Sequence, residues 1–312
     1  MKVEGSKVLV TGAGGFLASH IIGKLADRGA DVTGIDNLRA SHPDNLDRTS
    51  EKMTFRWLDI RDAASLEKII RGKDIVIHLA ANADVRSSMA EPEYDFQVNG
   101  GGTHNVVRLA QELDVLKVIY ASSAAVYGSP RYLPVDEAHP LNPISPYGAS
   151  KLAGEHYGFA FMHSAGLCFS AFRIFNAYGP FQRRYVMYDV LTKLASRPRR
   201  IEMHGTQYHA RDFVYVGDIT AAFLAAIEKD EHRDEACNLG SGARTSIAEV
   251  VTVAAELLGI EGLEVAFTGR SWPGDVTAVV ADVTRLSEWY QIEPSRDIRA
   301  GLSELARDLD LL

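Results

Sequence analysis

The chain has 312 residues, of which 46% are hydrophobic and 24% are charged, values that are ordinary for a globular protein. This length predicts one large domain and a smaller lobe. The net charge of −8 argues against a general nucleic-acid binder, and no apolar run approaches the roughly 20 residues that a bilayer-spanning helix needs. We expect a cytoplasmic protein, because no signal peptide precedes the first strand pattern and Cys168 and Cys237 lie in apolar surroundings, as buried, reduced thiols do.

A buried strand, a glycine-rich turn and a helix follow one another at the start of the chain. Residues 7–11 form an apolar run, Gly12 and Gly15 lie in the turn, and a helical pattern continues to Gly29. Gly12 permits a tight turn, and Gly15 lets backbone N–H groups approach a pyrophosphate at the N-terminus of the helix. This order of elements predicts a dinucleotide site, with the spacing G-x-x-G-x-x-A in place of the common G-x-G-x-x-G.

The second predicted strand, residues 31–36, ends in a carboxylate that bears on the choice of cofactor. Asp36 follows Gly12 at about the 20-residue distance at which an acidic side chain meets the adenosine ribose hydroxyls. Because a carboxylate repels a 2′-phosphate, the sequence favours NAD over NADP, and Arg39 nearby weakens that preference. The alternative is that Asp36 only caps the end of the strand.

Strand and helix patterns then alternate as far as residue 175 and become irregular beyond it. The predicted elements are strands at 53–58, 74–81, 117–123 and 167–175 and helices at 64–70 and 93–113. This alternation predicts an α/β fold with a doubly wound parallel sheet of the Rossmann type, covered on both faces. We assign residues 1–175 to a dinucleotide-binding domain, to which later strands return, and residues 176–312 mainly to a smaller substrate lobe.

Two further expectations concern the ends of elements. His78 closes the fourth strand and is expected to be a hydrogen-bonded histidine of the core rather than a ligand, and residues 295–312 are typical of a polar surface helix. Since no other cluster of His, Cys or Asp has metal-ligand spacing, we predict no metal.

The segment 145–151, Ser-Pro-Tyr-Gly-Ala-Ser-Lys, carries the predicted chemistry. Ser145 is a good helix N-cap and a proline follows it, so Tyr147 and Lys151 lie one turn apart on one helix face. A lysine beside a tyrosine favours the phenolate, which can take a proton from a sugar hydroxyl. A Tyr-x-x-x-Lys pair alone is weak evidence, and Lys151 can instead form an exposed ion pair with Glu155.

Several motifs together resemble the extended short-chain dehydrogenase/reductase family, and within it the NAD-dependent nucleotide-sugar epimerases and dehydratases. The resemblance covers nearly the whole chain, and the motifs are specific because they occur together, in order and at these spacings. They are Thr11-Gly12-Ala13-Gly14-Gly15-Phe16-Leu17, Asp36-Asn37-Leu38, Asp59-Ile60, His78-Leu79-Ala80-Ala81, Ser122-Ser123-Ala124-Ala125-Val126-Tyr127-Gly128, Tyr147-Gly148-Ala149-Ser150-Lys151, Arg173-Ile174-Phe175-Asn176 and Arg211-Asp212-Phe213-Val214.

The resemblance implies a tightly held NAD and a transient oxidation of the sugar at C4. Tyr147 is then the base at the C4 hydroxyl, Lys151 holds the nicotinamide ribose and lowers the tyrosine pKa, and Ser123 bonds the same hydroxyl. The implied NAD-binding residues are Gly12, Gly15, Phe16, Leu17, Asp36, Asn37, Asp59, Ile60, Leu79, Ala80, Ala81, Asn99, Ser122, Tyr147 and Lys151. The expected residues for a UDP-sugar substrate are Ser123, Asn176, Gln182, Tyr185, Arg211 and Arg270. The family also implies a homodimer, formed by the helices that begin near residues 93 and 146.

The sequence departs from the family pattern at three places. Ala18 replaces a helix-packing glycine, and the loop at 181–187, which follows Tyr-Gly-Pro and is expected to select the sugar, is shortened. The usual Arg-Pro-Gly-Asp segment is Trp-Pro-Gly-Asp at 272–275, and Arg270 is the nearest replacement for the missing guanidinium.

These observations leave several readings of the function open. The lead interpretation is 4-epimerisation of a UDP-hexose or UDP-N-acetylhexosamine. A 4,6-dehydratase of the usual kind is disfavoured, because Ala124 and Ala125 stand where its acidic pair is expected, but a UDP-GlcNAc 5,6-dehydratase would use the same oxidation and re-reduction at C4. The remaining readings are another sugar-nucleotide reductase and a non-enzymatic NAD-sensing module, although sensors of this kind usually lose the tyrosine or the lysine.

Overall fold

The computed structural model describes residues 1–229, 235–270, 276–294 and 297–312. A seven-stranded sheet, in which every pair of neighbouring strands is parallel, forms its centre. Across the sheet, the strands are β11 (Cys237–Leu239), β6 (Phe169–Ile174), β5 (Lys117–Ser123), β4 (Ile75–His78), β1 (Lys7–Thr11), β2 (Asp31–Asp36) and β3 (Thr54–Trp57). The predicted doubly wound parallel sheet is confirmed, and its strand order reverses between β1 and β4, where such sheets bind ligands.

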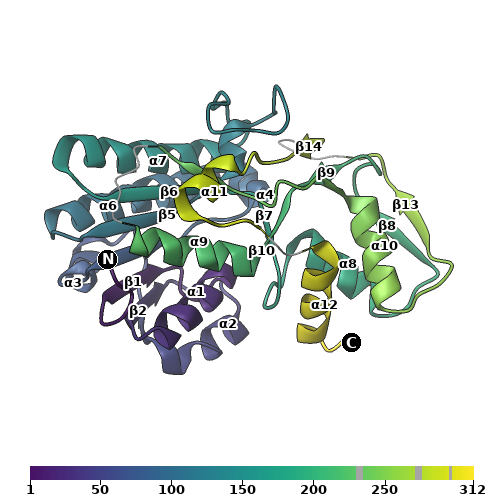
Figure 1. The fold of residues 1–312 in the computed structure, drawn as a ribbon, viewed down its shortest axis with the longest axis horizontal. Coiled ribbons are helices and arrows are strands. Elements are labelled where there is room, and N and C mark those ends of the chain that lie inside the picture. The colour runs from purple at the N-terminus through teal and green to yellow at the C-terminus, as the bar shows by residue number, and fades with distance from the viewer. Residues whose placement is uncertain (230–234, 271–275, 295–296) are drawn as a thin grey trace.

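Helices cover both faces of this sheet (Figure 1). Their apolar side chains form two cores, one on each face, so the strands are buried from both sides. One face packs against α1 (Phe16–Asp27), α9 (Val216–Glu228) and α11 (Thr284–Tyr290). The other packs against α3 (Ala63–Ile70), α6 (Thr103–Glu112) and α7 (Pro146–Ala165). Two of these helices and strand β11 follow residue 176, so the later part of the chain contributes to the sheet layer.

A smaller lobe with a core of its own lies beside the C-terminal ends of the strands (Figure 1). Its core is built from α8 (Tyr185–Leu194), β8 (Arg200–Met203), α10 (Ile247–Leu257), β13 (Glu264–Phe267) and α12 (Ile298–Asp308). Short strands join the lobe to the sheet: β7 (Asn176–Tyr178) pairs with β10 (Phe213–Tyr215), and β9 (Ala210–Arg211) pairs with β12 (Thr245–Ser246) and β14 (Ala278–Val279).

Two predicted helices differ from the observed ones. The helix expected at 93–113 is divided into α5 (Pro92–Asp95), a π-helical turn (Phe96–Gly102) and α6, and α4 (Val85–Ala90) precedes them. The π turn contains three glycines, and a Cβ added at Gly102 would lie 2.5 Å from Ile60 Cδ1, so the chain passes too close to Ile60 for a side chain. The tail is not a polar surface helix, because α12 buries Leu302 and Leu305 in the core of the smaller lobe.

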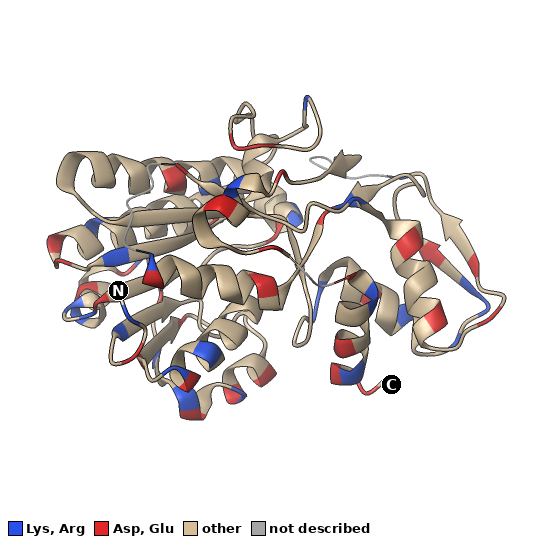
Figure 2. Ribbon diagram, in the orientation of Figure 1, with Lys and Arg blue, Asp and Glu red and all other residues tan. Residues whose placement is uncertain are grey.

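The remaining short elements are α2 (Pro43–Asp47) and two 3₁₀ turns, Ser50–Lys52 and Ala124–Tyr127. Acidic and basic residues alternate over the outer helices, whereas the central strands are mostly uncharged (Figure 2). Within the described residues, the structure contains no helix that is both long enough and apolar enough to cross a membrane. Cys237 is buried as expected, and Cys168 is only partly buried.

Candidate active site

The glycine turn after β1 lies against the loop that follows β4. Gly12 has φ +73°, and a Cβ placed on it would lie 2.8 Å from the Ala80 nitrogen, so only glycine fits. The backbone N–H groups of Leu79 and Ala80 donate to Thr11 Oγ1 at 3.2 and 3.1 Å, which ties the two loops together. Ala81 continues the same loop and is partly buried. This contact brings together the ends of β1 and β4 at the point where the strand order reverses.

The turn then leads into α1 with its first N–H groups available. Gly15 is the N-cap of α1 and makes no side-chain capping bond, and no acidic side chain lies in the first turn. Phe16 and Leu17 begin the helix and are partly buried, and Ala18 is packed in the core despite replacing the expected glycine. A helix N-terminus of this kind attracts phosphate groups through its N–H dipoles.

The carboxylate of Asp36 braces the turn. Its Oδ2 accepts the Gly14 N–H at 3.0 Å and its Oδ1 accepts the Leu38 N–H at 2.6 Å. Asn37 donates to Asp59 Oδ2 at 2.9 Å, and the Arg61 guanidinium beside Asp59 lowers the pKa of that carboxyl to about 2. Asp36 therefore orders the glycine turn, which is a role beyond the predicted contact with a ribose, and Asp59 supports Asn37.

His78 is a satisfied core histidine, as predicted. Its Nδ1 lies 2.7 Å from Thr11 Oγ1 and its Nε2 lies 2.9 Å from Thr103 Oγ1. Burial lowers its pKa to about 3, so the ring stays neutral and holds β4 against β1 and α6. Among the described residues, no group of three or more His, Cys, Asp or Glu side chains could hold a metal ion.

Tyr147, Ser123 and Lys151 gather where β5 ends and α7 begins. Ser145 caps α7 by accepting the Gly148 N–H at 3.1 Å, which confirms the predicted start of this helix. The Tyr147 hydroxyl shares a hydrogen bond with Ser123. The sequence predicts a lowered pKa for Tyr147, but here it is raised well above its usual value, because burial disfavours the phenolate more than the Ser123 bond stabilises it.

Lys151 is almost fully buried on the same helix. Its Nζ donates to the Ala121 carbonyl at 2.8 Å and lies 4.9 Å from the centre of the Tyr120 ring. Burial lowers the pKa of Lys151 to about 8, and the nearby carboxylates of Asp95 and Glu155 oppose that shift. The ammonium form is therefore present at neutral pH and is lost as the pH rises through about 8.

Asn99 lies in a buried polar network beside Lys151. It projects from the π-helical turn, where an extra backbone residue often marks a functional position. Its side chain accepts the Asn82 N–H at 2.8 Å and donates to Asp95 Oδ1 at 3.0 Å, while Ser150 donates to Asp95 Oδ2 at 2.6 Å. These contacts fix the loop after β4 against α7, and burial raises the pKa of Asp95.

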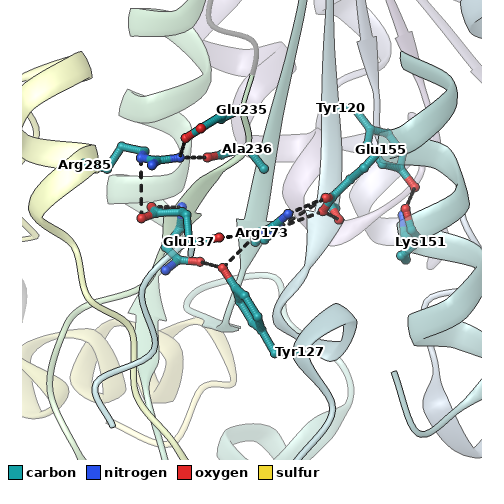
Figure 3. Close-up of polar contacts among 11 residues, drawn as sticks. Tyr120, Tyr127, Glu137, Lys151, Glu155, Arg173, Glu235, Ala236 and Arg285 are labelled. Atoms are coloured by element: carbon teal, nitrogen blue, oxygen red, sulfur yellow. Dashed lines mark hydrogen bonds and ion pairs between the residues drawn. The ribbon is translucent and has the colours of Figure 1, made fainter. Parts of the chain in front are cut away.

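Glu155 forms a buried ion pair rather than the exposed pair with Lys151 that the sequence left open. Its carboxylate is 1% exposed and accepts the Arg173 guanidinium at 2.8 Å, and it also accepts the hydroxyl of Ser122. Arg173 also donates to the hydroxyl of Tyr127 at 3.0 Å (Figure 3). Ser122, a predicted NAD ligand, thus joins β5 to α7 through Glu155.

The residues predicted to hold the substrate lie where the smaller lobe meets the sheet. Asn176 Nδ2 donates to the Asp212 carbonyl at 3.0 Å, and Gln182 Nε2 donates to the Ala177 carbonyl at 3.0 Å. Gln182 is buried, and its Oε1 has no hydrogen-bond partner among the described residues. Tyr185 donates to the Ala83 carbonyl in the loop after β4.

The two arginines occupy different positions in the lobe. Arg211 lies on β9 and donates to the carbonyl of Ala210 at 2.8 Å. Arg270 is exposed, and its carbonyl accepts the Gly205 N–H at 2.9 Å. The altered segment 272–275 lies outside the described residues.

Two groups of residues near the site escaped prediction from the sequence. Asp95 and Asn82 belong to no quoted motif, and only their contacts identify them, whereas Thr11 begins a quoted motif but had no assigned role. Glu155 and Arg173 could have been noticed in the sequence, because Glu155 lies one turn beyond Lys151 and Arg173 begins a quoted motif. Their ion pair becomes visible only in the folded structure.

The family model that matches the chain, over residues 8–240, is that of the NAD dependent epimerase/dehydratase family. The chain belongs to this family. A putative UDP-glucose 4-epimerase of Methanocaldococcus jannaschii is 36% identical over 304 residues, which are 96% of each chain. Among solved structures, the UDP-N-acetylglucosamine 4-epimerase of Methanobrevibacter ruminantium M1, in complex with UDP-N-acetylmuramic acid, is 32% identical with a TM-score of 0.91 over 98% of this chain and 99% of that one.

The UDP-glucuronic acid 4-epimerase of Bacillus cereus is also similar, at 26% identity and a TM-score of 0.90 over 97% of this chain and 99% of that one. A tyrosine-to-phenylalanine variant of that protein was solved with UDP-4-deoxy-4-fluoro-glucuronic acid and NAD. NAD is the cofactor of the epimerase/dehydratase family, and the residues here fit it. The N-terminus of α1 would offer N–H groups to a pyrophosphate, and Asp36, whose carboxylate contacts the turn, would meet the ribose hydroxyls.

The contact between Gly12 and Ala80 predicts that Gly12→Ala abolishes NAD binding. The added methyl group meets the backbone of Ala80 in the proposed cofactor cleft, whereas Gly72→Ala, at φ +75° with nothing within 4 Å, adds only the backbone strain. The measurement is the NAD released from each purified protein on denaturation. We expect wild-type content in Gly72→Ala and almost none in Gly12→Ala, and equal contents would contradict the proposed site.

The position of Asp95 predicts a change in pH dependence. Its negative charge raises the pKa of Lys151, so Asp95→Asn should lower that pKa below about 8 and shift the alkaline limb of turnover to lower pH. Glu93→Gln, an exposed change on the same short helix, is the control. Superimposable pH profiles for Asp95→Asn and wild type would show that Asp95 does not support the ammonium.

Proposed function

We propose that the protein is a UDP-sugar 4-epimerase that acts on a UDP-hexose or UDP-N-acetylhexosamine. The observation that carries the proposal is the grouping of Tyr147, Ser123 and Lys151 at the end of β5, which pairs with β4, the strand whose following loop contacts the glycine turn. The similar proteins named above as 4-epimerases of UDP-sugars support the choice of substrate class.

In this proposal, Tyr147 takes the proton of the sugar C4 hydroxyl and later returns it. Burial makes the phenolate costly, so the Ser123 bond and the Lys151 ammonium must stabilise it during turnover. NAD, when bound, supplies the hydride acceptor and then the hydride donor. Ser123 also orients the C4 hydroxyl, and the buried surroundings exclude water from the proton transfer.

The ends of the substrate are assigned to different elements. Arg211 and Arg270 bind the diphosphate, since a guanidinium can bond phosphate oxygens in pairs, and Asn176 orients it. Gln182, in the loop before α8, and Tyr185, the first residue of that helix, contact the sugar. Ala124 and Ala125 form the 3₁₀ turn after β5, where a 4,6-dehydratase needs acidic groups, and this favours epimerisation.

We also propose a homodimer formed by α6 and α7 together with the π-helical turn. Phe96 is 63% exposed and Tyr157 is 46% exposed, and the His104 ring lies 5.0 Å from that of Tyr157, so an aromatic surface runs along these helices. A surface of this kind in a single chain favours association with a second copy.

The reaction is tested by incubating the purified protein with UDP-glucose, UDP-N-acetylglucosamine and UDP-glucuronic acid, followed by mass spectrometry and separation of isomers. Tyr147→Phe should retain NAD but lose turnover by roughly 100- to 10,000-fold, because it removes only the proton-transferring oxygen. Tyr157→Phe, on the same helix but outside the proton-transfer site, is the control, because it keeps the aromatic ring that is proposed for the dimer interface. A new isomer of unchanged mass supports epimerisation, loss of one water indicates a dehydratase, and NAD binding without turnover indicates a sensor.

The dimer is tested by light scattering at micromolar concentration. We expect twice the 34.2 kDa chain mass for the wild type. Replacing Phe96 and Tyr157 together by lysine places two charges on the proposed interface and should give the chain mass, with an unchanged circular dichroism spectrum. A monomeric wild type would contradict the assignment.

A further inference from the structure

The short loop before α8, from Phe181 to the first helical residue Tyr185, adopts a backbone that needs outside support. Phe181 has φ +72° and Tyr185 has φ +71°. Bulky aromatic residues rarely occupy this left-handed region, and they persist there only where the surroundings hold them. Something other than local sequence preference must therefore fix this loop.

One carboxylate from the far end of the chain contacts the beginning of the loop. Asp308 closes α12, and its side chain is only 7% exposed. Its Oδ2 accepts the Phe181 N–H at 2.8 Å and the Arg183 guanidinium at 2.6 Å, and its Oδ1 accepts Arg48 at 3.2 Å. Two of these three donors are charged, and charge-assisted bonds of this length are stronger than neutral ones.

The ring of Phe181 is held by residues that also contact Asp308 or the glycine-turn helix. The Arg48 guanidinium lies 3.9 Å from the ring centre, and His20 of α1 stacks on the ring at 4.8 Å. His20 Nε2 lies 2.9 Å from the Pro180 carbonyl, just before the loop. Asp308 thus completes a set of contacts that joins α1, the loop and α12.

The other end of the loop reaches the catalytic side of the site. Tyr185 donates to the Ala83 carbonyl, and the Arg184 guanidinium lies 5.0 Å from the centre of the Tyr185 ring. Both side chains are close enough to Tyr147 to affect its pKa, Tyr185 raising it and Arg184 lowering it. Contacts that anchor Phe181 and Arg183 therefore also determine where the side chains of Arg184 and Tyr185 lie.

We propose that Asp308 is a positioning residue, which anchors the strained loop and thereby holds Arg184 and Tyr185 beside Tyr147 for the sugar. The proposal rests on the proposed function, because it assigns the loop to the sugar of a UDP-sugar. It makes the last helix of the chain part of the substrate site, although α12 carries no residue that touches the reacting atoms.

Trypsin reports on the loop directly, since Arg183 and Arg184 are adjacent cleavage sites and cleavage requires local opening. In Asp308→Ala, we expect cleavage at these two bonds, identified by mass spectrometry, to be at least about tenfold faster than in wild type. Asp308→Asn keeps the volume and one acceptor, so it should fold and show a smaller increase. Asp310→Asn, an exposed change two residues on, is the control and should match wild type.

The same variants are then compared in binding and turnover. If Asp308 positions the sugar loop, Asp308→Ala retains NAD and binds UDP like wild type, but its kcat/KM for the UDP-sugar falls by up to about 100-fold. Unchanged cleavage, or faster cleavage with unchanged kcat/KM, would overturn the proposal. If the wild type turns over no UDP-sugar, the proposed function is overturned instead. In that case, UDP-sugar binding to Asp308→Ala is compared with wild type, and equal affinities would also overturn the positioning role.

Discussion

Lys151 is an almost fully buried cation, and the surroundings of the site depend on the need to stabilise its charge. An ammonium group that loses its water must find acceptors and counter-charges, or it gives up its proton. Lys151 has the Ala121 carbonyl as an acceptor and Asp95 and Glu155 as nearby carboxylates, and its pKa still falls to about 8. The balance leaves a cation that is charged at neutral pH but close to releasing its proton, which suits the role proposed for Lys151 beside Tyr147.

The carboxylates that support Lys151 are buried themselves and need partners of their own. Asp95 is bonded to Ser150 and Asn99, which brings the π-helical turn into the site, and Glu155 is bonded to Arg173, which brings in β6. Removing one member of a buried ion pair commonly costs about 3–5 kcal/mol, because the other charge is left without compensation. The polar network therefore fixes the distance between β5, β6 and α7 more strictly than apolar packing alone, and Figure 3 shows how Arg173 and Glu155 bridge β6 and α7.

The fold was predictable from the sequence because its strands are short apolar runs separated by glycine turns and helical patterns. The cofactor turn was equally accessible, since Gly12, Gly15 and Asp36 act through local backbone geometry and a fixed spacing. The start of α7 followed from Ser145 in the same way. The predictions that failed depend on close packing. The π turn brings Gly102 too close to Ile60 for a side chain, and the burial of α12 depends on a core that assembles from distant segments.

The cofactor turn depends on local backbone geometry, whereas the proposed sugar site depends on packing between distant segments. The dinucleotide half is encoded locally, so a few residues within the first strand, turn and helix suffice to identify it. The strained backbone at 181–185 is held by Asp308, which follows it by more than 120 residues. Arg48, which bonds Asp308, precedes the same segment by more than 120 residues. A substitution in α12 can therefore change the shape of the sugar site without altering any motif. The cofactor turn is thus encoded by neighbouring residues, whereas the shape of the proposed sugar site depends on contacts between distant segments.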